Sequence, residues 1–230
     1  GPVDLSFLMK FSLSVPGLDS QRYPKAEPVY PPEFEETADL FQVIRQRDVL
    51  VFHPFESFEA VDDFIADAAG DPAVMAIKMT LYRVSGDSVI VRSLALAAEA
   101  GKQVTVVLEL KARFDEERNI AWAKKLEQAG CHVIYGLVGL KTHAKVALVI
   151  REEEGILQRY VHIGTGNYNG KTAKQYTDVG LFTSNTPIGE DVSALFNEMT
   201  GYSTPHDWKA LCVAPTHLKP ALFDYIKREI

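Results

Sequence analysis

Apolar and polar positions alternate in two different ways along this chain. From residue 48 to residue 135, short apolar runs are separated by stretches whose apolar positions recur with a helical period. The short runs predict strands at residues 48–52, 73–80, 103–110 and 131–135. The stretches predict a helix that Ser57 can cap and further helices at 87–100 and 115–130. This alternation indicates parallel strands with helices on both faces of the sheet.

The pattern changes after residue 140. Apolar runs at 143–150 and 156–163 flank the polar turn 151–155, which is typical of a β-hairpin, and 177–183 is a further predicted strand. We therefore expect an α/β fold in which a mixed sheet is flanked by helices on both faces. The remaining predicted helices are 34–47, 187–202 and 218–230. Residues 3–35 are rich in proline and show no clear period, so they predict an irregular arm.

Composition narrows the class of protein. Of the 230 residues, 47% are hydrophobic and 24% are charged, which is typical of a globular protein. The net charge of −7 has the wrong sign for a general nucleic-acid binder, so a polyanion would have to meet a local basic cluster. No apolar stretch is long enough to cross a bilayer, and no signal peptide is visible. Cys131 and Cys212 lack a paired or metal-like spacing, so a reduced, cytoplasmic location is expected, with peripheral membrane association left open.

His143 and Lys145 are the strongest candidates for chemistry. They open the predicted strand 143–150 and, because side chains alternate along a strand, they point the same way. An imidazole can attack phosphorus while a neighbouring ammonium stabilises charge on the phosphoryl oxygens. The glycine turn, residues 164–167, can add backbone N–H groups and the Asn167 amide. The alternative is that His143 is a structural histidine.

Two arginines follow predicted parallel strands. Arg83 lies just beyond the run 73–80 and Arg113 just beyond 103–110, and ligands bind at the carboxyl ends of such strands. Both guanidinium groups would face one crevice, where their planar forks suit phosphate oxygens. The alternative is that each arginine is solvated or pairs with a local acid such as Asp115.

Tyr176 and Asp178 follow the glycine turn. Tyr176 can stack on a nucleotide base, although an aromatic residue beside a strand is often part of the core. Asp178 can hydrogen-bond one nitrogen of His143 and leave the other free to attack, or it can simply cap the turn. The other histidines show no metal-ligand spacing, and His162 is the least certain of them because it adjoins the glycine turn. No common nucleotide-binding glycine loop is present.

Five blocks of sequence resemble one family closely. They lie at residues 48–58, 77–84, 109–119, 139–145 and 162–178, and they include GLKTHAK and HIGTGNYNGKTAKQYTD. These blocks, in this order, resemble the bacterial polyphosphate kinases that phosphorylate themselves on histidine. The resemblance implies reversible transfer of the terminal phosphate of ATP to inorganic polyphosphate, with Mg²⁺ as cofactor and a homo-oligomer as the full-length enzyme.

The resemblance also implies a domain layout. Residues 1–35 would comprise a tag scar at Gly1-Pro2 and an arm from a preceding domain. Residues 36–215 would form the first of two phospholipase-D-like catalytic domains, and 216–230 would begin the connection to the second. Because that second domain is missing, the isolated chain is expected to be inactive as a kinase.

The resemblance implies roles for individual residues of this sequence. His143 matches the phosphorylated histidine, Arg83 and Arg113 match magnesium-associated arginines, and Tyr176 matches a nucleotide-binding position. Arginine has no lone pair for a metal, so we expect both arginines to hold phosphate oxygens that in turn hold Mg²⁺. Ile150 occupies the aspartate position of the phospholipase-D motif, and Asp178 is expected to replace that aspartate.

Two other functions remain open at this point. The chain could be a phospholipase-D-like hydrolase that cleaves phosphodiesters, or a non-catalytic fragment that binds a polyanion. Trapping phosphate on the protein from ATP would favour the kinase, whereas turnover of a diester would favour the hydrolase.

Overall fold

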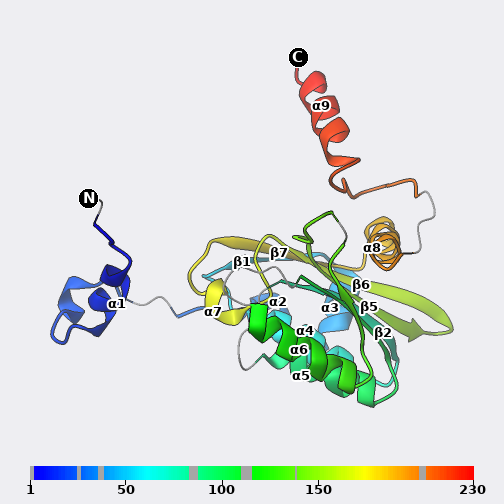
Figure 1. The fold of residues 1–230 in the computed structure, drawn as a ribbon. Coiled ribbons are helices and arrows are strands. Elements are labelled where there is room, and N and C mark those ends of the chain that lie inside the picture. Colours follow the sequence, from blue (N-terminus) through cyan, green and yellow to red (C-terminus); the bar gives the residue numbers. More distant parts are fainter. Residues whose placement is uncertain are drawn as a thin grey trace.

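A seven-stranded sheet forms the centre of the described part of the chain (Figure 1). The computed structural model describes residues 3–24, 27–35, 39–82, 88–109, 116–137, 139–201 and 206–230. The strand order is β1-β7-β6-β5-β2-β3-β4. The strands are β1 (Val49–His53), β2 (Val74–Leu81), β3 (Gln103–Leu108), β4 (His132–Tyr135), β5 (Lys145–Glu153), β6 (Ile156–Gly164) and β7 (Asp178–Thr183).

The sheet is mixed, as predicted, but its first strand is not where the alternation placed it. β2, β3 and β4 are parallel neighbours, whereas β5, β6 and β7 are antiparallel. β1 pairs antiparallel with β7, with His53 opposite Asp178. The prediction of a parallel β1 is therefore wrong, because its partner comes from the last strand of the chain and local pattern carries no information about distant pairing.

Helices cover both faces of the sheet, as predicted. The first face is covered by α2 (Pro32–Glu35), α3 (Leu40–Gln46), α4 (Glu59–Gly70), α5 (Val89–Glu99) and α6 (Glu116–Gln128). The second face is covered by α8 (Thr186–Met199). Alternation along β5 explains the two layers: Ala147 and Val149 join the first cluster, and Val146 and Leu148 pack against Val192 of α8 and its neighbours.

Local sequence fixes where these helices begin. Ser88 caps α5 by accepting a hydrogen bond from the Val91 N–H at 3.3 Å. Asn185 caps α8 in the same way through the Ile188 N–H, also at 3.3 Å. α4 begins at Glu59, one residue later than a Ser57 cap would place it, and Ser57 Oγ still accepts a 3.2 Å hydrogen bond from the Glu59 N–H, as the predicted cap would.

The two ends of the chain stand away from the sheet in Figure 1. The predicted irregular arm contains α1 (Phe7–Ser14), which is a correction: Phe7 and Phe11, four residues apart, stack edge to face, and after Pro2 no proline occurs until Pro16, beyond the helix. The predicted helix 34–47 is divided between α2 and α3, with 36–38 outside the described residues. α9 (Leu218–Arg228) ends the chain, and no described helix is long and apolar enough to cross a membrane.

Candidate active site

The segment that carries His143 lies at the carboxyl end of β2. β5 runs antiparallel to β2, so its first residues lie beside the last residues of β2. Thr80, which is 2% exposed, joins the two strands: its hydroxyl donates to the Ala144 carbonyl at 2.7 Å and accepts from the Val146 N–H at 3.1 Å. The predicted ligand site lies at the carboxyl ends of the parallel strands, and His143 lies at this end of the sheet, which we call its open edge.

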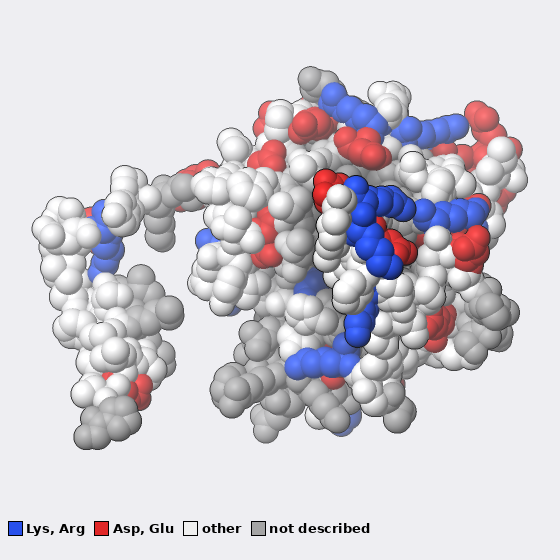
Figure 2. All heavy atoms as spheres, turned by 90° about the horizontal axis from the view of Figure 1, so that it is seen from above, with Lys and Arg blue, Asp and Glu red and all other residues white. Residues whose placement is uncertain are grey.

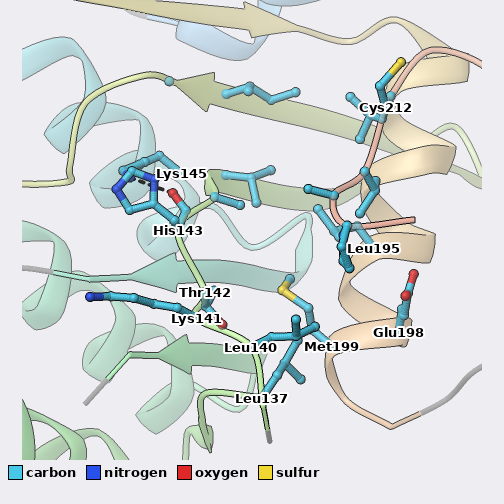
Figure 3. Close-up of a pocket in the computed structure, with 18 of the residues that line it drawn as sticks. Leu137, Leu140, Lys141, Thr142, His143, Lys145, Leu195, Glu198, Met199 and Cys212 are labelled. Carbon is cyan, nitrogen blue, oxygen red and sulfur yellow. Dashed lines mark hydrogen bonds between the residues drawn. The ribbon is translucent and has the colours of Figure 1, made fainter. Parts of the chain in front are cut away.

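His143 and Lys145 lie together at this edge (Figure 3). The Lys145 ammonium donates a 2.6 Å hydrogen bond to the His143 carbonyl oxygen, which restrains the backbone between them. Tyr82, just after β2, packs edge to face against the imidazole at a centroid distance of 5.5 Å. The Lys141 and Lys145 ammonium groups lie 5.2 Å and 5.6 Å from the centre of the same tyrosine ring.

The surroundings set the protonation of both groups. Partial loss of hydration lowers the pKa of the exposed His143 imidazole, and the charges of Lys145 and Lys141 lower it further. His143 is therefore neutral near pH 7, with a lone pair available. Burial lowers the pKa of Lys145 to about 8, while attraction to Asp178 opposes that fall. Lys145 is thus a cation at neutral pH that loses its charge just above it.

The glycine turn approaches the same edge. Gly164 lies opposite Lys145 in the β5–β6 ladder and opposite Gly180 in the β6–β7 ladder. A Cβ added at Gly166 would lie 2.5 Å from Asp178 Oδ2, which is closer than real contacts allow. The absence of a side chain at Gly166 is therefore what lets the turn fold back onto β7.

Asp178 does not orient His143. Among the described residues, its hydrogen bond is to the Thr165 hydroxyl, which donates to Asp178 Oδ1 at 2.8 Å and accepts from the Val179 N–H. The predicted bond to the imidazole is wrong for a topological reason. β6 lies between β7, which carries Asp178, and β5, which follows His143. Asp178 instead acts at a distance through its charge on Lys145.

A carboxylate that the sequence did not single out holds the loop before His143. Glu109 directly follows β3, is 5% exposed, and accepts a 3.0 Å hydrogen bond from the Thr142 N–H. The Asn119 amide in α6 donates to the carbonyl oxygens of both Glu109 and Tyr82 at 3.0 Å, which joins the ends of β3 and β2. The rule applied to Arg113, that residues just after parallel strands face the site, could have identified Glu109.

The remaining predicted residues fall into two groups. Tyr176 is 62% exposed, so it is not the core aromatic that the alternative required and is free to meet a ligand. Asn167 lies on the glycine turn with its Oδ1 buried. Arg83 and Arg113 lie outside the described residues.

A cavity of about 610 Å³ opens beside His143. His143, Lys141 and Lys145 lie on one side of it, and Leu137, Leu140, Leu195 and Met199 form an apolar wall on the other (Figure 3). Sequence reasoning missed the part of this wall that α8 supplies, Leu195 and Met199, because α8 carries no chemical motif. A polar edge beside an apolar wall is a common composition for a small-molecule site.

Asp191 holds the segment that closes this cavity. It is fully buried in α8 and accepts hydrogen bonds from the N–H groups of Lys209, Ala210 and Leu211 at 3.0, 2.7 and 2.8 Å. His206 Nε2 lies 2.8 Å from its other oxygen. Three backbone donors converge on one carboxylate oxygen and hold residues 209–211 against α8, and residues 211–215 then line the cavity.

Basic and acidic side chains are mixed on the surface near the cavity. Figure 2 shows lysine and arginine side chains interspersed with acidic ones on the face from which α9 projects. Within the described ranges, no group of three or more histidine, cysteine, aspartate or glutamate side chains is placed to hold a metal ion. The cations beside His143 suit phosphate oxygens, and these residues do not by themselves form a magnesium site.

Comparison with known proteins agrees with this geometry. The family model described as Polyphosphate kinase C-terminal domain 1 matches residues 39–205. Polyphosphate kinase of Bacillus anthracis is 51% identical over 231 residues, which covers 100% of this chain but 33% of that protein. The chain therefore spans about a third of the length of the curated relatives it matches.

Solved structures agree on the fold. The crystal structure of polyphosphate kinase from Porphyromonas gingivalis superposes with a TM-score of 0.85 at 34% identity, covering 98% of this chain and 38% of that one. Nuc, a phospholipase D family member from Salmonella typhimurium, gives a TM-score of 0.52 at 16% identity over 70% of this chain and 97% of its own, which confirms the predicted phospholipase-D-like fold. By the match over 39–205, the chain belongs to the polyphosphate kinase family.

Proposed function

We propose that this chain is the phosphoryl-accepting part of an enzyme that transfers the terminal phosphate of ATP to inorganic polyphosphate and back. One observation carries the proposal: His143 is an exposed imidazole of lowered pKa beside the ammonium of Lys145, at the mouth of a cavity. A neutral imidazole next to a fixed cation suits attack on a phosphorus atom that carries negative oxygens.

The reaction has two steps. One imidazole nitrogen of His143 donates its lone pair to the γ-phosphorus of ATP, an N–P bond forms, and the bond to the bridging oxygen breaks with its electrons leaving on ADP. A terminal oxygen of polyphosphate then attacks the same phosphorus, and the N–P bond breaks to restore the imidazole. Each step is reversible, so ATP can also be regenerated from polyphosphate.

Other residues hold the reacting groups. Lys145 and Asn167 bind phosphoryl oxygens, and the exposed Tyr176 stacks on the base. Arg83 and Arg113, assigned by resemblance, grip further phosphate oxygens. Mg²⁺ would enter with the phosphates of ATP and polyphosphate and would neutralise part of their charge.

The rest of the enzyme completes this site. Phosphoryl transfer depends on donors that surround the phosphate in a water-excluded site, and the described groups grip it from one side. We therefore propose that the isolated chain has little kinase activity, and that the full-length enzyme is a cytoplasmic homo-oligomer, with any membrane association peripheral.

A phospholipase-D-like diesterase is the competing function. Its support is the shared fold with Nuc, and a fold alone does not determine chemistry. Against it, Ile150 in β5 stands where the hydrolase motif has an aspartate, so the carboxylate that would orient the histidine is replaced by an aliphatic side chain.

The test uses a polypeptide extended to the length of the relatives and ATP labelled on its γ-phosphate. We expect acid-labile, base-stable label on the protein, and none on His143→Asn. A matched His132→Asn variant, which changes an exposed histidine of β4, should label normally. Label that persists in His143→Asn, or rapid turnover of a phosphodiester without protein labelling, would contradict the proposal.

A further inference from the structure

A second histidine lies buried in the first face of the sheet, close to the glycine turn. His162, in β6, is 3% exposed, and its ring packs against Phe182 at a centroid distance of 4.6 Å. Burial lowers its pKa to about 3, and the nearby imidazole of His53 contributes to that fall. His162 is therefore neutral at physiological pH and closed to bulk solvent.

One ring nitrogen of His162 is satisfied and the other is not. Nδ1 lies 2.9 Å from the hydroxyl of Tyr168, the residue that follows the glycine turn. Nε2 is buried without a hydrogen-bond partner among the described residues. Whichever nitrogen carries the proton, Nε2 is left without a partner, and a buried polar atom without a hydrogen bond destabilises the fold.

A second orphaned atom faces the same space. Asn167 Oδ1, on the glycine turn, is also buried without a partner, and both residues line a cavity of about 10 Å³. His53 lines it too, and because His53 Nδ1 lies 2.8 Å from the Glu56 carbonyl oxygen, that nitrogen carries the hydrogen and Nε2 is an acceptor. Two buried polar atoms without partners, His162 Nε2 and Asn167 Oδ1, thus belong to residues that line one small space.

The volume of this cavity limits which molecule can occupy it. About 10–15 Å³ is the space that one water molecule needs, together with two to four polar partners. A phosphate or a nucleotide is far too large. A water can donate to Asn167 Oδ1 and make its second hydrogen bond with His162 Nε2.

We propose that this cavity holds one buried water that joins His162 to Asn167, and that His162 is a positioning residue for the glycine turn. The imidazole would then fix two consecutive residues, Tyr168 directly and Asn167 through the water. With Oδ1 engaged inside the protein, the Asn167 NH₂ is the end left to meet a ligand. Only this last consequence rests on the proposed function, since the water site stands on geometry alone.

The water is tested first in the ligand-free chain. A high-resolution crystal structure should show one ordered water within hydrogen-bond distance of both His162 Nε2 and Asn167 Oδ1. An empty cavity would overturn the proposal. So would an Asn167 amide that is turned inward and donates directly to Nε2.

Two variants separate positioning from packing. His162→Phe keeps a ring of similar volume but removes both nitrogens, whereas His162→Gln keeps a polar atom near the position of Nε2. In His162→Phe we expect the water to be lost, the Asn167 side-chain amide signals in NMR spectra to broaden, and polyphosphate affinity to fall about tenfold, the loss of one oriented hydrogen bond. His162→Gln should restore all three.

The outcomes distinguish this inference from the proposed function. Unchanged Asn167 amide signals in a folded His162→Phe variant would contradict positioning by His162, even if His143 is phosphorylated. Should His143 prove unreactive, the water and the amide signals would still be measurable, because neither requires phosphoryl transfer.

Discussion

The two histidine regions of this sheet differ in one respect that decides their chemistry. His143 precedes β5 at the open edge of the sheet, whereas His162 lies inside β6 beneath the helices of the first face. Burial lowers the pKa of both rings, so both are neutral near pH 7. Only His143 faces a cavity large enough for a substrate. Position relative to the sheet edge, and not pKa alone, therefore separates a nucleophile from a support.

The largest expected effect concerns acid stability. The folded chain binds fewer protons at His162 than the unfolded chain between about pH 6.5 and its folded pKa of about 3. The free energy of unfolding contributed by this residue is therefore complete above pH 6.5 and falls by up to about 1.4 kcal/mol per pH unit below it. Denaturant unfolding at several pH values should show a shallower acid slope for His162→Phe. The exposed-site variant His132→Phe should retain the wild-type slope.

The second-largest effect, on stability, is expected at Gly180, where the backbone passes close to the His162 ring. A Cβ at Gly180 would lie 2.7 Å from His162 Nε2, so Gly180→Ala must displace a buried ring and should destabilise the chain by about 1–3 kcal/mol. Gly70→Ala is the matched control, because a Cβ there meets nothing within 4 Å. Thermal unfolding of both variants measures the difference. Equal stability would mean that His162 is not packed as described.

Ligand binding near His143 should weaken at high pH, whereas the stability contributed by His162 falls at low pH. Because the pKa of Lys145 is about 8, most of its charge is present at pH 7 and is lost as pH rises through 8. Polyphosphate affinity, measured by calorimetry, should fall about tenfold between pH 7 and pH 9.5. Lys145→Arg should remove this dependence because guanidinium stays charged, whereas Lys141→Arg should keep it. A flat wild-type profile would exclude Lys145 from the binding site.

The smallest effect is expected at Asp178. Its attraction raises the pKa of Lys145, so Asp178→Asn should move the midpoint of the affinity profile to lower pH. Because Asp178 bonds Thr165 and not the imidazole, reactivity of His143 should change by about twofold or less. A loss of more than tenfold in His143 phosphorylation would restore Asp178 as the residue that orients it.

Much of the sheet could be predicted from sequence because period and strand length are local properties. The strands after residue 70 lie close to their predicted positions, and the hairpin of β5 and β6 was recognised from its polar turn. The antiparallel pairing of β1 with β7 was missed because it joins the two ends of the domain. Helix α1 was missed because the prolines that follow it dominated the composition of the arm.

The site was predictable where a motif is contiguous and not where contacts come from distant strands. His143, Lys145 and the glycine turn are close in sequence, and the ladder between β5 and β6 brings them together. The Glu109 carboxylate, the apolar wall from α8 and the Asp191 anchor each depend on residues far apart in the chain. Asp178 was assigned to the wrong partner because spacing does not reveal that β6 lies between it and His143.

The central claim is that His143 is the reactive nucleophile of this domain. The most direct test treats the 230-residue chain with phosphoramidate, a small phosphoryl donor that does not require the rest of the enzyme, and follows phosphohistidine at each site by mass spectrometry. We expect His143 to be labelled at least tenfold faster than the exposed His132, because Lys145 and Lys141 attract the donor, and His162 to remain unlabelled. Labelling of His143 no faster than His132, or prior labelling of His162, would contradict the account.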